Sequence, residues 1–373
     1  MNGIKKGDRT TAVWQNGGFS AKINSSSSIE LLCKTEHLCF DFRHFAKLQN
    51  VVPHNKPMIT TKRNFLKFYL SISFAFLFFN ALGTFMIYTY FDLINKGKSE
   101  IKTLFMLLFG IAVILMAFYT VWQYFRNSPT IKIDNHKITF NKNEYLISDI
   151  KKVYLTGKMP FKYLITFPME GTRIKFKDNS VKYFFNDMYQ NSWEIKYFLQ
   201  KVVIEKGEFS KPENNKIDPK LIRFIKTEDF KGNQWTSLRG ISLWGLILFV
   251  LFMVFSKGKV PTNINFWIVF LTFGFFWFYF NSWLMHYFSL DKEFLIIKNH
   301  NLIWKQDIYK ISNIKEVTFE TQGKMPNCLR VIENNFKEKL YPAGTLTDGK
   351  WIEFKLKLEK NGVKVRNECV YEE

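Results

Sequence analysis

Cysteine and acidic residues are both scarce in this chain of 373 residues. The four cysteines, Cys33, Cys39, Cys328 and Cys369, have no spacing typical of a disulfide framework, which fits a reducing compartment. Asp and Glu number 32 against 53 Lys and Arg, so the formal net charge is +21. Such an excess of positive charge suits a chain that lies against an anionic membrane surface at least as well as one that binds nucleic acid.

Four long apolar segments contain no Asp, Glu, Lys or Arg: residues 69–90, 104–125, 240–255 and 266–288. A helix needs about 20 apolar residues to cross the hydrocarbon core, and three of the four segments have that length. The third is shorter, but Arg239 and Lys257 at its flanks can reach the headgroups. The sequence therefore predicts two transmembrane helical hairpins and excludes a water-soluble monomer. Because ionisable residues inside a membrane usually mark ion pathways, their absence argues against a coupled transporter.

Basic residues are concentrated on the outer flanks of the two predicted hairpins rather than in the short loops inside them. By the positive-inside tendency, both long polar regions and both termini are expected in the cytoplasm of a bacterium, with the chain crossing the inner (cytoplasmic) membrane several times. The basic residues expected at the membrane interface are Lys62, Arg63, Lys67, Arg126, Arg223, Lys226, Lys231 and Arg239.

The chain contains an internal repeat. An offset of 164 residues places 145–153 on 309–317 and Asn135-His136 on Asn299-His300, and eight of the nineteen positions from 135 to 153 are identical, which chance explains poorly. A Gly-Lys-Met-Pro sequence follows in both copies. These two loops are the candidate partner-contact sites, although turn geometry alone would also favour Gly and Pro. Their residues are Gly157, Lys158, Met159 and Pro160 in the first copy, and Gly323, Lys324, Met325 and Pro326 in the second.

Each copy follows its hairpin with a strand-like pattern and then a helical one. In the first copy the pattern predicts turns at 157–160 and 168–171, and a closing helix from about 187 to 206 that contains Trp193. Residues 172–177 alternate between apolar and basic side chains. The second copy predicts a helix at 347–360 that contains Trp351. The predicted strands of the first copy are 130–133, 137–140, 150–155, 162–167, 172–177 and 180–185.

An antiparallel meander closed by one helix, repeated after paired spans, resembles the membrane-associated bacterial pleckstrin-homology-like (PH-like) family. The resemblance rests on this element order and on the pattern Tyr-x-Ile-Ser-(Asp/Asn)-Ile-Lys-x-Val at 145–153 and 309–317, and it covers about 130–206 and 290–361. It implies a bent sheet capped by a helix, acting as a membrane-tethered binding module without catalytic residues. Phosphoinositide recognition is not favoured, because residues 134–137 between the first two strands offer a single lysine.

The fold class expected is thus an α+β membrane protein with two transmembrane hairpins, each followed by a PH-like module. Met58 opens a short basic lead into the first span, and we expect translation to start there, with residues 1–57 the product of an upstream start assignment. The expected domains are a disordered extension at 1–57, the first hairpin at 58–126, module 1 at 127–206, a linker that could hold an interfacial helix at 207–235, the second hairpin at 236–289 and module 2 at 290–373.

Three sets of residues resemble chemical sites, and each has a simpler interpretation. Residues 344–350 match the Gly-x₄-Gly-Lys spacing of a phosphate loop, but Trp351 stands where Ser or Thr would bind Mg²⁺, so a helix-capping loop is favoured. The recurring His136 and His300 are expected to be turn residues. The remaining set has ligand types suited to zinc but none of the usual spacings, and consists of Cys33, His37, Cys39 and His44.

We therefore expect no enzyme, cofactor, metal site or nucleic-acid partner. The function expected from the sequence is a membrane-anchored scaffold or binding protein that displays two cytoplasmic modules to a protein partner, to the membrane surface or to another copy of the chain. The alternative is a regulatory or structural component of a membrane transport system.

Overall fold

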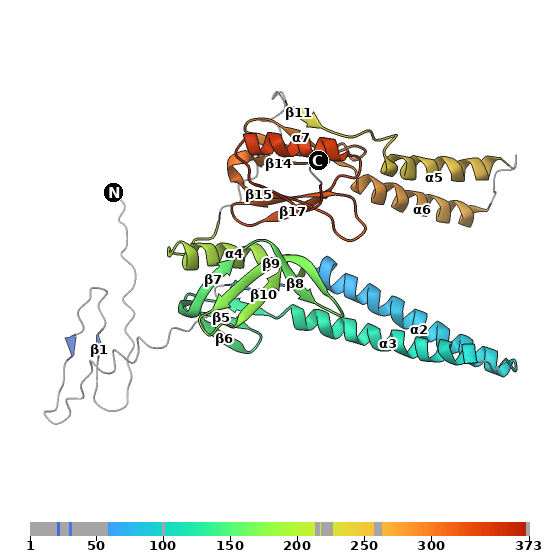
Figure 1. Ribbon diagram of the computed structural model, residues 1–373, viewed down its shortest axis with the longest axis horizontal. Helices are drawn as coiled ribbons and strands as arrows, with labels where there is room; N and C mark the ends of the chain where they lie inside the picture. The colour runs from blue at the N-terminus through green and yellow to red at the C-terminus, as the bar shows by residue number, and fades with distance from the viewer. Residues whose placement is uncertain are drawn as a thin grey trace, which may run out of the picture. The chain divides into compact units, whose positions relative to one another are not determined.

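The computed structural model describes residues 59–98, 101–212, 217, 227–256 and 263–370, together with the paired strands β1 (Ala21–Lys22) and β2 (Glu30–Leu31). The chain divides into two units, Met1–Lys56 and Pro57–Glu373, and Figure 1 shows the elements of the second. Apart from β1 and β2, the expected disordered extension lies outside the described residues, as do the zinc-type residues and Met58. The proposed interfacial helix lies largely outside them as well.

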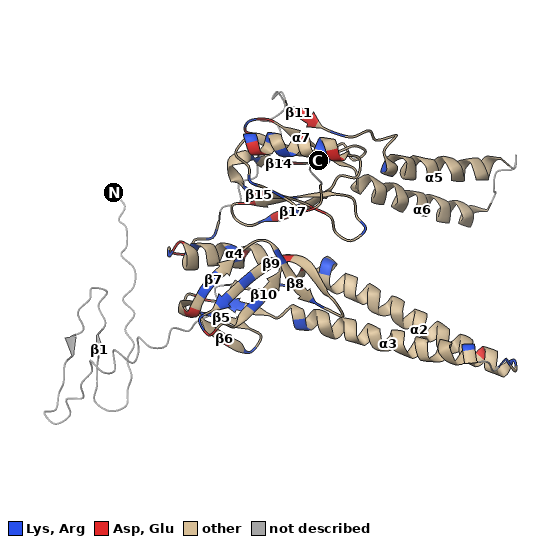
Figure 2. Cartoon of the chain, in the orientation of Figure 1, with Lys and Arg blue, Asp and Glu red and all other residues tan. Residues whose placement is uncertain are grey.

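Within the described part of the second unit, four helices are long and apolar enough to cross a membrane. They are α2 (Ser71–Asn95), which continues the π-helix η1 (Phe65–Leu70), α3 (Ile101–Asn127), α5 (Leu238–Phe255) and α6 (Ile264–Trp283). Figure 2 shows that charged residues occur only near the ends of these helices. α2 and α3 pack closely, because a Cβ built on Gly83 would lie 2.7 Å from the carbonyl oxygen of Gly110.

The fourth predicted span is wrong at its C-terminal end. The apolar segment runs to residue 288, but α6 ends at Trp283 and strand β12 (His286–Leu290) begins almost at once. Phe288 and Leu290 are buried in a protein core rather than facing lipid. Hydropathy cannot separate these cases, because a strand buried on both faces is as apolar as a membrane helix.

Module 1 contains two antiparallel sheets and a closing helical segment. Its first sheet has the strand order β3-β4-β5-β6, with β3 (Ile59–Thr60), β4 (Ile131–Ile133), β5 (Lys137–Phe140) and β6 (Asn143–Leu146). In its second sheet β9 (Thr166–Phe176) pairs with β7 (Ile150–Tyr154), β8 (Lys158–Lys162) and β10 (Val181–Phe185). The closing segment is α4 (Ser192–Phe198) followed by the π-helix η4 (Leu199–Ile204).

Module 2 has the same plan, except for one added strand that follows its closing helix and pairs in parallel with its neighbour. Its first sheet has the order β11-β12-β13-β14, with β11 (Glu228–Phe230), β13 (Phe294–Asn299) and β14 (Gln306–Lys310) beside β12. Its second sheet has the order β17-β16-β15-β18, with β15 (Ile314–Glu320), β16 (Cys328–Glu333), β17 (Glu338–Pro342) and β18 (Val365–Asn367). The helix α7 (Asp348–Lys360) begins one residue after Thr347, as the sequence predicts.

Each module begins before its pair of membrane helices, not after it. β3 precedes η1 and α2, yet it pairs with β4, which follows α3. In the same way β11 precedes α5 and pairs with β12, which follows α6. The helix pairs are therefore insertions within a sheet, and the predicted starts of the modules at 127 and 290 are wrong. Strands of two or three residues are too short to give a detectable alternation in the sequence.

Two predicted turns of module 1 are part of strands. Residues 158–160 belong to β8, and 168–171 lie inside the long strand β9. Pro160 and Pro168 face each other in this ladder, where β8 is an edge strand that tolerates proline. Gly171 marks a close approach, since a Cβ there would lie 2.7 Å from the carbonyl oxygen of Phe184. Strand β6 was not predicted.

The sequence repeat matches equivalent elements only over part of its length. Residues 147–149 and 311–313 form the same 3₁₀ turn, each followed by an equivalent strand, β7 or β15. The predicted equivalence of His136 and His300 is wrong. β5 and β13 hold the same place in their sheets, but His136 precedes β5 whereas His300 follows β13. An offset without gaps cannot follow the two modules through loops of different length, such as 141–142 and 300–305.

Candidate functional site

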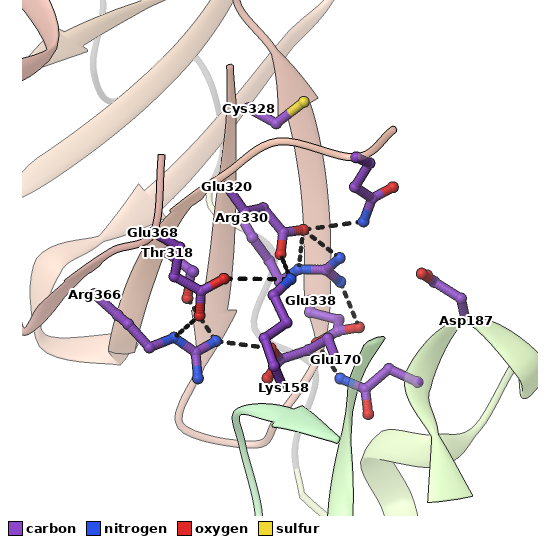
Figure 3. A network of polar contacts seen from close by, with 12 residues as sticks. Lys158, Glu170, Asp187, Thr318, Glu320, Cys328, Arg330, Glu338, Arg366 and Glu368 are labelled. Carbon is purple, nitrogen blue, oxygen red and sulfur yellow. Dashed lines mark hydrogen bonds and ion pairs between the residues drawn. The ribbon is translucent and has the colours of Figure 1, made fainter. Parts of the chain in front are cut away.

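A cluster of charged side chains lies where module 1 meets the second sheet of module 2 (Figure 3). Strand alternation places it there. In β15, Val317 and Phe319 face the core of module 2, while Glu316, Thr318 and Glu320 alternate with them on the opposite face. All three of these polar residues are at most 2% exposed. Module 1 thus packs against that face of the sheet, where solvent would otherwise lie.

Arg330 on β16 is at the centre of this cluster. Its Nη2 lies 2.6 Å from Oε1 of Glu320, and its Nη1 lies 2.8 Å from Oε1 of Glu338 on β17. The other oxygen of Glu338 accepts a hydrogen bond of 2.7 Å from Nδ2 of Asn186 in module 1. Arg330 is 1% exposed, so its guanidinium holds two carboxylates in a site almost free of water.

Three ion pairs of this cluster cross between the modules (Figure 3). Lys158 on β8 contacts Glu320 and lies 3.3 Å from Glu368, which follows β18. Arg366 on β18 reaches Glu170 on β9, with 2.8 Å between its Nη2 and the carboxylate. The second oxygen of Glu170 accepts a hydrogen bond from the Gly157 N–H. Module 2 thus holds the start of the first Gly-Lys-Met-Pro loop in two ways. It contacts Lys158 directly, and it contacts Glu170, which in turn binds the Gly157 N–H.

The cluster shifts the titration of its members. Burial acts to raise the pKa of Glu320, but Arg330 and Lys158 outweigh it, so that pKa lies below its usual range. For Glu170 burial dominates and raises the pKa, although Arg366 opposes it. Burial also lowers the pKa of Lys196 on α4, which is 1% exposed. Glu320 therefore stabilises the fold above its unfolded-state pKa and loses this contribution as the pH falls.

A cleft of roughly 360 Å³ opens beside the cluster and is lined by both modules. Module 1 contributes an aromatic wall through Trp193, and module 2 contributes Tyr309, Lys337 and Lys339. The Lys337 ammonium lies over the ring of Trp193, 4.7 Å from the ring centroid. Lys339 forms an ion pair with Asp307, with 2.6 Å between Nζ and the carboxylate. An aromatic surface with mixed charges at its rim suits a protein segment better than a small reactive substrate.

The two Gly-Lys-Met-Pro loops are not used alike. Gly157 and Gly323 both have positive φ, so backbone geometry accounts for glycine at each position. Lys158 is engaged by the other module, whereas Lys324 is exposed and makes no ion pair among the described residues. Met159 and Pro160 lie in β8, while Met325 and Pro326 lie in the β15–β16 loop. The first loop therefore contacts the other module, whereas the lysine of the second loop is exposed to solvent.

The expected membrane-interface residues have several roles. Arg63 donates from Nη2 to the carbonyl oxygen of Ser128 at 3.0 Å and covers the ring of Phe125, so it ties η1 to the end of α3. Lys67 pairs with Asp187 of module 1 at 2.5 Å. Lys62 is exposed, and Arg126 stacks over Trp122. Lys231 lies 3.9 Å from Asp229, Arg239 packs against Gly344, and Arg223 and Lys226 lie outside the described residues.

The remaining site candidates have structural partners. Lys350, in the sequence that resembles a phosphate loop, pairs with Glu353 on the surface of α7 at 2.7 Å. Gly344, the first glycine of that sequence, lies against Arg239 and the carbonyl oxygen of Leu284. His300 hydrogen-bonds to Thr345 at 3.2 Å, and burial lowers its pKa to about 4. Within the described residues, no three His, Cys, Asp or Glu side chains are grouped as metal ligands.

Comparison with known proteins does not assign the chain to a family. No protein-family model matches it, and a search of curated proteins found no matching sequence. The PH-like resemblance therefore rests on the residues and elements of this chain alone, and the functional argument depends on the geometry described above.

Proposed function

We propose that the chain is a membrane-anchored scaffold in which two tandem PH-like modules act as one cytoplasmic body that binds a protein partner. In each described module, antiparallel strands in two sheets precede one packed helix, and module 2 adds the parallel strand β18 after α7; the shared part of this arrangement supports the PH-like interpretation and a duplication of one unit. Four apolar helices support membrane insertion. Basic residues lie at both ends of α2 and α3 (Figure 2), and the excess at the end nearer module 1, with Lys62, Arg63, Lys67 and Arg126 against Lys96, Lys98 and Lys102, supports a cytoplasmic location on the inner membrane of a bacterium.

The observation that carries this proposal is the cleft at the junction of the modules. A cleft between two freely moving modules could not hold a fixed shape, but here both walls are joined by the buried cluster around Arg330. Trp193 supplies the kind of aromatic surface that dominates protein interfaces, and Lys67, Lys337 and Lys339 supply charge at the rim. The joined modules thus present a preformed surface on which little ordering is required for binding.

Site-specific photo-crosslinking in intact cells tests this function. A photoreactive amino acid at Lys339 faces the cleft, and the same group at the exposed Lys142, in the β5–β6 turn, serves as the matched control. We expect one defined protein adduct from position 339 that is absent from position 142 and is lost when Trp193 is replaced by alanine.

The mass and identity of the adduct decide between the forms of the proposal. An adduct of twice the chain mass would identify self-association, and an adduct with a transport protein would make the chain a component of that system. Identical adducts from both positions, or none from position 339 in a folded chain, would refute cleft binding.

A further inference from the structure

The two modules differ in the segments that contact their own membrane helices. Module 1 has the added strand β8, which forms a β-hairpin with the first half of β9. In the described part of module 2, the loop 321–327 takes the place of this added strand. Module 2 has its own longer segment, because its β13–β14 connection, 300–305, exceeds the β5–β6 turn 141–142 of module 1. Two unrelated additions have therefore reached the same target, the cytoplasmic end of the second helix of each pair.

In module 1 the β8–β9 hairpin runs beside the last two turns of α3. Asn127 Nδ2 donates to the carbonyl oxygen of Lys162 at 2.6 Å, and the rings of Tyr124 and Phe161 lie 5.4 Å apart. Further into the helix, Thr120 Oγ1 lies 2.5 Å from the hydroxyl of Tyr163. Thr120 precedes Asn127 by seven residues, which corresponds to about 10 Å along the axis. The tip of the hairpin thus extends along a helix that is long and apolar enough to span a membrane.

The tip exposes apolar side chains at that depth. Leu164 and Ile165 are 62% and 65% exposed, although the tip is hydrogen-bonded to α3. α3 has 27 residues and is about 40 Å long, whereas the hydrocarbon core is about 30 Å thick. With α3 centred in the bilayer, about 5 Å of each end projects beyond the hydrocarbon core. Thr120, about 10 Å from the end of α3, then lies about 5 Å inside the boundary of headgroups and acyl chains, and the tip lies beside it.

Module 2 reaches α6 with a different loop. Lys305 Nζ donates to the hydroxyl of Tyr279 at 2.9 Å, and Asn301 Nδ2 donates to Ser282 Oγ at 3.0 Å. Tyr279 is about one turn from Trp283, where α6 ends. Between these anchors Ile303 and Trp304 are 80% and 72% exposed. Tryptophan beside lysine is the combination that membrane interfaces favour, because the indole suits the headgroup region and lysine can extend to the phosphates.

We infer that the two tips, Leu164-Ile165 and Ile303-Trp304, are immersed in the cytoplasmic interface of the lipid bilayer and hold each module at a fixed orientation on the membrane. This inference rests on the proposed function, because it requires α3 and α6 to cross the membrane. Lipid is the occupant that the geometry favours, since each tip touches a helix whose surface is itself in contact with lipid. Immersion also removes from water the exposed apolar surface of both tips.

Fluorescence quenching of the full chain in lipid nanodiscs tests the inference. An environment-sensitive thiol probe is placed singly at Leu164 or Ile303, with Cys33, Cys39 and Cys369 replaced by serine. Cys328 stays unlabelled, because it is buried and burial raises the pKa of its thiol to about 12. Matched controls are probes at Leu146 and Leu356, which are exposed to a similar degree but lie on β6 and α7.

We expect probes at Leu164 and Ile303 to be quenched by lipids that carry a nitroxide near the headgroup and shielded severalfold from aqueous iodide, with the reverse at Leu146 and Leu356. Equal access of iodide to all four positions would overturn the inference. Probes at Leu115 and Leu271, in the middle of α3 and α6, separate the two levels of the account. If deep nitroxides quench these two probes but the tips are not shielded, only the immersion of the tips is rejected. If deep nitroxides do not quench these two probes, the claim that α3 and α6 cross the membrane is itself rejected.

Discussion

Replacing Arg330 with methionine should destabilise the folded chain by on the order of 3 kcal/mol. The side chain of Glu320 is 1% exposed and that of Glu338 is 14% exposed, so removal of the guanidinium leaves buried carboxylates without their main partner. Lys158 still contacts Glu320, which keeps the cost at the lower end of the range for broken buried pairs. Equilibrium unfolding of the detergent-solubilised chain measures the effect.

Two companion variants test the cause of this loss. Lys339→Met breaks an ion pair with Asp307 whose side chains are 56% and 40% exposed, and it should cost less than about 1 kcal/mol. Adding Glu320→Gln to Arg330→Met removes one of the orphaned charges and should recover part of the lost stability, because Lys158 retains Glu368 at 3.3 Å. Equal losses from Arg330→Met and Lys339→Met would mean that the cluster is not buried between the modules.

The second large effect is expected from Trp351→Ala, at about 3–5 kcal/mol. Trp351 on α7 is fully buried, and its ring centroid lies 4.7 Å from that of Phe319 and 5.4 Å from that of Phe288. Alanine leaves a cavity at the point where both sheets of module 2 meet the helix. Loss of the near-ultraviolet circular dichroism of module 2 at a lower denaturant concentration than in the wild type is the measurement.

Trp193 is the matched control, and the structure changes what is expected of it. The repeat predicts that Trp193 and Trp351 anchor equivalent helices, but Trp193 is only partly buried and lines the cleft. The interior of module 1 is filled instead by Ile195 and Phe198 of α4. Trp193→Ala should therefore cost roughly 1–2 kcal/mol. A loss as large as that of Trp351→Ala would restore the equivalence and contradict the cleft.

The sequence predicts elements well where a single physical signal dominates. Uncharged apolar length identifies the four described helices that are long and apolar enough to cross a membrane, and the alternation of 172–177 places Ile174 and Phe176 in the core. The helical period from Thr347 locates α7. The strands β3 and β11 could not be predicted, because their pairing depends on partners that lie beyond two membrane helices.

The charged cluster was also missed, for a different reason. Glu316, Thr318 and Glu320 alternate with apolar residues, which is the pattern of a strand with one face in water. Module 1 brings Lys158 and Glu170 against that face, and a pattern within one strand carries no information about such docking. The only sequence signal is the recurrence of Gly-Lys-Met-Pro, which selects Lys158 but does not reveal its partner.

The central claim, that the two modules form one body, is tested most directly by crosslinking between Gln200 and Lys315. Their side chains meet outside the charged cluster, with 2.6 Å between Lys315 Nζ and Gln200 Oε1. Cysteines at both positions are joined by a short bismaleimide in membranes, and a protease site inserted between residues 213 and 216 is then cut. The account predicts that the two halves stay linked, that Arg330→Met weakens the link, and that a Lys142–Lys315 cysteine pair does not form it. Separate halves from the Gln200–Lys315 pair in the wild-type background would contradict it.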